Sequence, residues 1–473
     1  MLRFDVDWLL FGAFLLGLAW VPYWEGSNHL MAWGINATLF PGLAVCYEIT
    51  VLLRNERHPV ALKELWLPAT LLGAVLVWIV VQNASWTPNS WHHPIWAMAG
   101  HALDKSIDGS ISVNRDLTTQ ALVRLLTAVS VFWLALQFCR NAARADWVVA
   151  AMAALGCAYA AYGLIEFASA SGPVSWFGST SAPGFVTSTF YNRNHYATYA
   201  GMGLIAICGL LFRHYRNEVT GGPIAFRIAS VIEASAHKGA GLLGGFFLLM
   251  VTLLLTTSRG GLLATGLGLT TLALVWFGRR DEPARKRKMI LQAFTIVFVV
   301  FILFGTTFVV FGENLLGKIA AGGVQDDNRI AVYAITLQSI FTAPLLGYGY
   351  GTFPDVFPLF RDHSIATQGI WQQAHDTYLE VFQGLGIVFG ALLITSSVVL
   401  FWNCLIGALR RRQGAMVCCV ATSAAVLVGI HSLVDFSLQI QAVTLTLMAF
   451  LGAGVAQSMN PGHDGPRAAA QRW

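Results

Sequence analysis

The chain has 473 residues, of which 56% are hydrophobic and only 11% are charged, and its formal net charge is +5. A soluble domain has roughly 25% charged residues, because polar side chains must cover its surface. The composition, with a mean hydropathy of +0.61, therefore excludes an ordinary soluble enzyme, a disordered protein and a nucleic-acid-binding protein. It predicts an all-α, polytopic membrane protein embedded in a lipid bilayer.

Twelve apolar segments are long enough to cross a bilayer as helices, which takes about 20 mostly apolar residues. They lie near residues 6–23, 30–53, 66–84, 117–139, 146–169, 193–213, 239–257, 260–278, 289–312, 377–407, 414–434 and 438–457. No small-residue cleavage site follows the first segment, so we interpret it as a retained span and not as a signal peptide. The sequence predicts one integral membrane domain over residues 1–473.

Basic residues follow every second segment, including the stretches 279–288 and 410–412. Because short loops rich in Lys and Arg stay in the cytoplasm, this alternation predicts a multi-pass protein of the inner membrane with both termini cytoplasmic. This topology leaves eight basic residues off the cytoplasmic side of the membrane: Lys105, Arg115, Arg124, Arg193, Arg259, Lys318, Arg329 and Arg361. Of these, Arg329 follows Asp326 and Asp327, which favours a local ion pair.

Three segments are expected on the opposite, periplasmic face, and the longest is 313–376. Loops longer than about 12–15 residues are usually functional or disordered. This one contains an amphipathic stretch over 330–341, so we expect a folded periplasmic cap between the ninth and tenth helices. Its glycines Gly347, Gly349 and Gly351 indicate a turn with positive φ. They are not followed by the Lys-Ser/Thr pair of a phosphate-binding P-loop.

Two arginines stand at the predicted periplasmic boundary. Arg193 begins the sixth segment, and Arg259 lies at the tip of a tight hairpin between the seventh and eighth segments. A guanidinium binds two phosphate oxygens at once, so a pair of arginines on one face predicts an anion site. Snorkelling to the interface, or an ion pair with Asp327 or Asp435, is the alternative.

Several titratable residues lie near the same boundary. His375 precedes the tenth segment, where the helix dipole favours the neutral imidazole that a general base requires. A loop histidine that only forms hydrogen bonds is the alternative. The Thr377–Glu380 spacing predicts a capping box, which gives Glu380 a structural role. His431 and Asp435 are four residues apart and are expected to pair on one helix face.

These features together resemble the O-antigen ligase and polymerase superfamily of bacterial envelope proteins. The resemblance rests on the multi-span layout and on four motifs, best matched over about residues 185–445. The motifs are Ser258-Arg259-Gly260-Gly261, Pro344-Leu345-Leu346-Gly347-Tyr348-Gly349, residues 375–380, and His431-Ser432-Leu433-Val434-Asp435-Phe436. The family more often has Asn at the position of Asp376.

The resemblance implies a GT-C-like glycosyltransferase that works at the periplasmic face without a metal or cofactor. Its donor would be an undecaprenyl diphosphate-linked oligosaccharide, and its acceptor a glycan or a lipid-linked glycan. Arg193 and Arg259 would hold the diphosphate and His375 would activate the acceptor hydroxyl. His195, Asp376, Glu380, His431 and Asp435 would support them. A chain-length regulator and a flippase of the same pathway would be its partners.

Three enzymatic interpretations remain open. We favour a polymerase that joins repeat units of an O-antigen or exopolysaccharide. The others are an O-antigen ligase that transfers polymer to lipid A core, and a protein O-oligosaccharyltransferase. Outside the enzymes, a twelve-span transporter has a similar layout, but it would place unusual charges near the bilayer midplane. A scaffold for polysaccharide assembly is a further alternative.

Overall fold

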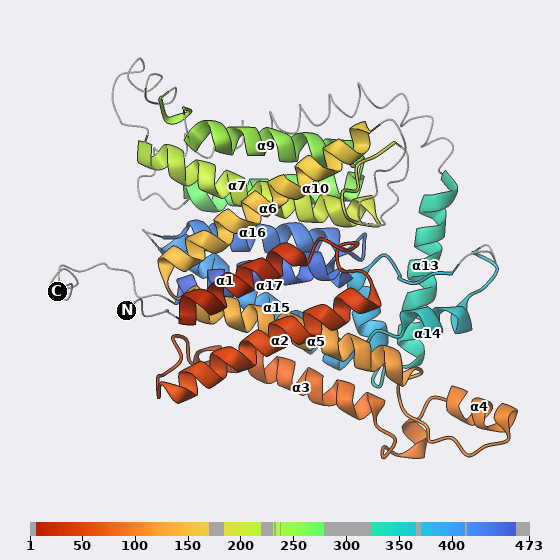
Figure 1. Cartoon of the computed structure of the whole chain (residues 1–473). Coiled ribbons are helices and arrows are strands. Elements are labelled where there is room, and N and C mark those ends of the chain that lie inside the picture. The colour runs from red at the N-terminus through yellow and green to blue at the C-terminus, as the bar shows by residue number, and fades with distance from the viewer. Residues whose placement is uncertain are drawn as a thin grey trace.

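A computed structural model describes residues 6–169, 184–218, 230, 233–236, 238–278, 323–365, 370–411 and 414–459. These residues form helices and contain no strand, as the composition predicts (Figure 1). The α-helices are α1 (Val6–Trp20), α2 (Leu30–Leu53), α3 (Trp66–Asn83), α4 (Ile95–Leu103), α5 (Arg115–Phe138), α6 (Ala142–Ala168), α7 (Arg193–Glu218), α9 (Lys238–Leu255), α10 (Arg259–Gly278), α13 (Gly323–Thr342), α14 (Phe353–Phe360), α15 (Thr377–Arg410), α16 (Met416–His431) and α17 (Gln441–Ser458). Short 3-10 helices cover Leu62–Leu65, Asn89–Trp91 and Ser437–Gln439.

Long helices of the bundle run roughly side by side in Figure 1, in three groups. α6, α7, α9 and α10 form one group, α2, α3 and α5 form another, and α15, α16 and α17 lie between them. α16 packs against α7, α10 and α17, and α17 packs tightly against α5. Most side chains of α16 and α17 are consequently buried. The last helices of the chain thus form the centre of the bundle.

The helices agree closely with the predicted spans. Within the part of the chain that the structure describes, nine helices are long and apolar enough to cross a membrane. α1 and α16 correspond to predicted spans but are shorter, with 15 and 16 residues. The predicted span 289–312 and Lys318 lie outside the described residues. The chain is therefore a multi-pass membrane protein.

The bundle has two distinct ends. Five helices begin at one of these ends: α5, α7, α10, α15 and α17 (Figure 1). The helices α13 and α14 also lie there. We call this end of the bundle the site end. At the other end Arg144, near the start of α6, stacks over Trp8 of α1 at 4.9 Å. There the Gln457 side chain of α17 also donates a hydrogen bond to the Cys139 carbonyl. α1 therefore begins and α17 finishes at the same end of the bundle, as the alternation of basic loops requires.

The long segment predicted over 313–376 is folded where the structure describes it. The amphipathic stretch 330–341 lies in α13, and α14 packs beside it. Val332, Phe353 and Phe357 form a small apolar core there that is separate from the main one. Tyr333 donates a hydrogen bond to the carbonyl of His375. This segment therefore supports the loop that leads into α15.

The glycine-rich turn is confirmed, and it fills a break in α15. Gly347, Gly349 and Gly351 have φ values of +66°, +101° and +83°. α15 is not continuous, because Gly386 has a non-helical backbone with φ +77°. The turn runs alongside this break, and the Gly349 amide donates to the Gly384 carbonyl at 3.0 Å. The break leaves backbone carbonyl groups of α15 without hydrogen-bond partners inside the helix. Backbone amides of the glycine-rich turn donate to these carbonyls instead.

Gly347→Ala is expected to lower the yield of folded protein sharply. A Cβ at Gly347 would stand 2.4 Å from the Gly384 carbonyl oxygen, and the positive φ adds strain. Gly266→Ala is the matched control, since a Cβ at this position of α10 would meet no atom within 4 Å. Size-exclusion profiles of the two variants in detergent measure the difference. Equal yields would contradict this account of the turn.

Candidate active site

A buried carboxylate, Asp435, lies at the centre of the site end. Its side chain is only 1% exposed, and Oδ1 accepts a hydrogen bond from Asn194 Nδ2 at 3.2 Å. Oδ2 accepts a hydrogen bond from the Ser437 hydroxyl. Two histidines approach the same group: His195 Nε2 lies 3.7 Å from Oδ2, and His375 Nδ1 lies 3.7 Å from Oδ1. Four side chains from three separate segments thus converge on one carboxylate.

The charge state of Asp435 follows from these neighbours. Burial by itself raises the pKa of Asp435, but the approach of His375 and the charges of His195 and His431 lower it. The Ser437 hydroxyl lowers it further, so the pKa lies below its ordinary value. Asp435 is therefore an anion at neutral pH and can orient a histidine ring.

His375 is held in an unusual position between this carboxylate and the solvent. Its backbone has φ +59°, and its side chain is 20% exposed, whereas that of His195 is 2% exposed. The ring packs edge-on against Phe436 at 4.9 Å and Trp371 at 5.9 Å. The 3.7 Å separation between His375 Nδ1 and Asp435 Oδ1 is longer than a hydrogen bond but within the range of electrostatic attraction. Of the histidines around Asp435, His375 is the most accessible.

Arg193 and Arg259 are both linked to this cluster through their chain neighbours. Asn194, which donates to Asp435, also accepts a hydrogen bond from the Ser258 hydroxyl at 2.8 Å. Arg193 donates to Thr257 at 2.8 Å, so the start of α7 is tied to the turn before α10. The sequence predicts that Arg193 begins its helix and that Arg259 lies at the tip of the hairpin. Arg193 does begin α7, and Arg259 is the first residue of α10, directly after the turn.

A third arginine, Arg329 of α13, joins them. Its guanidinium lies 3.5 Å from the carbonyl of Val434, the residue before Asp435. It also lies within electrostatic range of Arg193, as does Arg259. The local ion pair expected for Arg329 involves Asp326 and Asp327, whose side chains lie outside the described residues.

In the part of the chain that the structure describes, these three guanidinium groups lack an ion-pair partner. Among the described residues, no carboxylate lies within 4 Å of Arg193, Arg259 or Arg329. Asp435, which the sequence offers as an alternative ion-pair partner, is already surrounded by histidines and by amide and hydroxyl donors. Clustered cations need an anionic partner, and planar guanidinium groups match phosphate oxygens particularly well. Three guanidinium groups near one another are chemically suited to a phosphate or diphosphate.

The predicted capping box at the start of α15 is wrong in its details. The N-cap is Asp376, whose Oδ1 accepts hydrogen bonds from the amides of Tyr378 and Leu379. Asp is a stronger N-cap than Thr and stands one position earlier. Glu380 instead accepts hydrogen bonds from the Ala374 amide and the Gln439 side chain. Asp376 and Glu380 thus fix the loop on both sides of His375.

The expected pairing of His431 and Asp435 on one helix face is also wrong, because α16 ends at His431. The chain turns there, and Asp435 lies in the connection to α17. His431 Nδ1 instead lies 2.6 Å from the Thr198 hydroxyl and 3.4 Å from that of Ser437. His431 therefore joins the cluster through hydroxyl groups.

Sequence reasoning did not assign roles to several residues that complete this site. Asn194 and Ser437 bond directly to Asp435, and Ser258 bonds to Asn194. Phe436 packs against the rings of both His195 and His375. Ser258 and Phe436 lie inside the motifs that carry the family resemblance and Ser437 directly follows one, which is the signal that could have found them. Asn194 lies outside these motifs, next to Arg193.

A comparison with protein families finds that residues 244–394 match the family described as O-antigen ligase. The matched region includes Arg259, Arg329 and His375. It supports membership of the O-antigen ligase and polymerase superfamily and, in general terms, glycan transfer of the ligase or polymerase type. Such a family implies lipid-linked glycan substrates. A search of curated proteins gives no significant match.

Proposed function

From the match of residues 244–394 to the O-antigen ligase family, we propose that this protein transfers a glycan from undecaprenyl diphosphate to a sugar hydroxyl. The reaction takes place at the periplasmic face of the inner membrane, which we assign to the site end. It polymerises repeat units of an O-antigen or exopolysaccharide. The observation that carries the proposal is the cluster of Arg193, Arg259 and Arg329 beside a His375–Asp435 pair.

In the proposed reaction, the arginines bind the diphosphate of the donor. The acceptor hydroxyl attacks the anomeric carbon, the new glycosidic bond forms, and the bond to the diphosphate breaks. The lipid diphosphate leaves with the bonding electrons, and the arginines stabilise its developing charge by fixed electrostatics. His375 takes the hydroxyl proton, and Asp435 stabilises the imidazolium that results. Asn194 and Ser437 hold Asp435 in place.

Ligation to lipid A core is the second candidate, because the matched family is described as O-antigen ligase. The same residues would serve it, since only the acceptor differs. The side of the membrane and the location of the termini are parts of the same proposal. The basic loops and the start of α1 at the end opposite the site support this part of the proposal.

Surface glycans of a deletion strain, alone or complemented with wild type or His375→Ala, test the proposal. A polymerase predicts glycan stopped at one repeat unit in the deletion strain, restored by wild type and not by His375→Ala. Full-length polymer that stays on its lipid carrier would instead mean a ligase. Unchanged glycans in the deletion strain would contradict both and favour a transporter.

A further inference from the structure

A cavity of about 610 Å³ lies inside the bundle, apart from the arginine cluster. α3 packs against α15, and α5 packs against α17. The cavity runs between these two pairs, with residues of α16 on one wall. Its volume falls within the range of roughly 300–1,000 Å³ that is typical of small-molecule sites.

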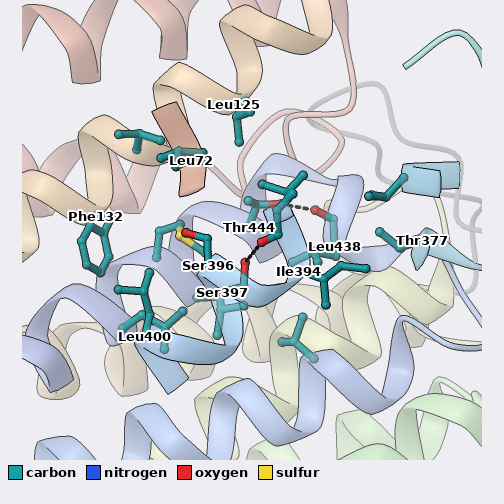
Figure 2. A pocket seen from close by; sticks show the side chains of 18 of the residues that line it. Leu72, Leu125, Phe132, Thr377, Ile394, Ser396, Ser397, Leu400, Leu438 and Thr444 are labelled. Atoms are coloured by element: carbon teal, nitrogen blue, oxygen red, sulfur yellow. Dashed lines mark hydrogen bonds between the residues drawn. The ribbon is translucent and has the colours of Figure 1, made fainter. Parts of the chain in front are cut away.

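The walls of this cavity are apolar over most of its length. Figure 2 shows Leu72, Leu125, Phe132, Ile394 and Leu400 around the open space, with Phe132 and Leu400 far from Thr377 and Leu438. Along α5 the lining extends from Ala121 to Trp133, which corresponds to about 18 Å at 1.5 Å per residue. A space of this shape and surface suits a hydrocarbon chain.

The cavity also reaches the lipid-facing surface of the bundle. Leu62 and Val398 both line it, and they are 59% and 52% exposed. Exposed apolar side chains on membrane helices face lipid. A lipid could therefore pass between the bilayer and the cavity from the side.

The charged and amide side chains of the cavity lie at the site end. They are Arg124 near the start of α5, Glu380 near the start of α15, and Gln439 and Gln441 beside the start of α17. The Arg124 guanidinium stacks over Trp33 at 4.4 Å and donates to the Gln439 carbonyl. Within the described part of the chain it has no carboxylate within 4 Å. Glu380 lies within electrostatic range of Arg124 but forms no ion pair with it. The guanidinium has further donors and can bind an acidic head group, with the apolar chain extending into the bundle.

This polar end lies directly against the loop that carries His375. Glu380 accepts a hydrogen bond from the amide of Ala374, the residue before His375. Thr377 lines the cavity and donates to the Asp435 carbonyl at 3.3 Å. Arg193, Arg259 and Arg329 do not line the cavity. A molecule in the cavity and an anion held by these arginines would therefore approach His375 from different elements of the fold.

We propose that the cavity holds the hydrocarbon chain of a lipid-anchored acceptor whose acidic head group binds Arg124. The inference rests on the proposed function, which places the donor diphosphate on the arginine cluster. Two sites that meet at His375 allow both substrates to remain in the membrane during transfer. The acceptor class is then a lipid-linked glycan, and not a protein.

Leu72→Trp tests this assignment, because Leu72 faces the cavity and an indole would fill part of it. Purified protein in proteoliposomes is given carrier-linked donor and one of two acceptors: lipid-linked glycan, or the same glycan released from its lipid. Leu72→Trp is expected to raise the KM for the lipid-linked acceptor by about tenfold or more, a loss of about 1.4 kcal/mol in binding. Its turnover with the released glycan and its KM for the donor should stay at the wild-type values. Leu67→Trp, on the same helix outside the cavity, is the matched control and should behave as wild type.

A second readout does not depend on transfer. Native mass spectrometry of wild type mixed with lipid-linked glycan should show a bound lipid that Leu72→Trp loses and Leu67→Trp keeps. If wild type transfers nothing but this pattern holds, the proposed function fails and the cavity remains a lipid site. A raised donor KM in Leu72→Trp would assign the cavity to the donor chain and overturn the inference. Equal losses of transfer with both acceptors would also overturn the inference. The same holds if Leu72→Trp folds and changes none of these measurements. Leu125→Trp, from the α5 wall, repeats the test if Leu72→Trp does not fold.

Discussion

His375→Ala is expected to lower glycan transfer by about 10²–10⁴-fold, the usual contribution of a general base. Donor binding should be unchanged, because the arginines and not His375 contact the diphosphate in our proposal. The assay measures transfer by purified protein and, separately, binding of carrier-linked donor. Asp435→Asn, which keeps the shape of the side chain but removes its charge, should reproduce part of the loss.

His363→Ala is the matched control for this prediction. His363 is exposed and belongs to the same segment between α14 and α15, but it lies outside the cluster around Asp435. It should keep wild-type activity. Full activity in His375→Ala would remove His375 as the base, whatever the result for Asp435.

Arg259→Ala is expected to reduce the transfer rate by about 10²–10³-fold, as loss of a fixed electrostatic donor does in other enzymes. The fold should tolerate the change, because Arg259 is exposed and has no ion pair among the described residues. Arg259→Lys should recover only part of the activity, since an ammonium group cannot bind two phosphate oxygens in the same fork geometry. Initial rates at saturating acceptor, with titrated donor, measure both variants.

Arg54→Ala provides the control for a lost surface arginine. Arg54 forms an exposed ion pair with Asp7 at 3.0 Å, at the end of the bundle opposite the site. Such pairs contribute only about 0–1 kcal/mol, so activity should persist. A wild-type rate in Arg259→Ala would show that the anion site lies elsewhere.

The sequence predicts the helices of this fold well because membrane spans are long and apolar, and their signal is local. It also predicts that Arg193 begins its helix and that Arg259 lies at the tip of a hairpin, and the structure agrees closely with both. It does not predict the break at Gly386, since glycines within an apolar run, here Gly384, Gly386 and Gly390, do not by themselves indicate a non-helical backbone.

The contacts of the site were harder to predict. His195, His375 and Asp435 are separated by many residues, and only tertiary packing brings them together. The end of α16 at His431 depends on a turn that hydropathy does not detect. Arg329 could be interpreted locally from Asp326 and Asp327, but the described structure brings it to Val434. The cavity is likewise a property of five packed helices and has no counterpart in any single segment.

The position of α17 at the centre of the bundle has a consequence for biosynthesis. The cluster around Asp435 needs residues from α7, from the loop before α15 and from the connection to α17. Chains are synthesised from the N-terminus, so the site is incomplete until the ribosome has passed Ser437 and α17 can pack against α5. Until then, nascent chains in the membrane would hold some of the cationic groups but no oriented base. Ribosome-stalled or truncated chains would consequently be inert toward the carrier lipid pool.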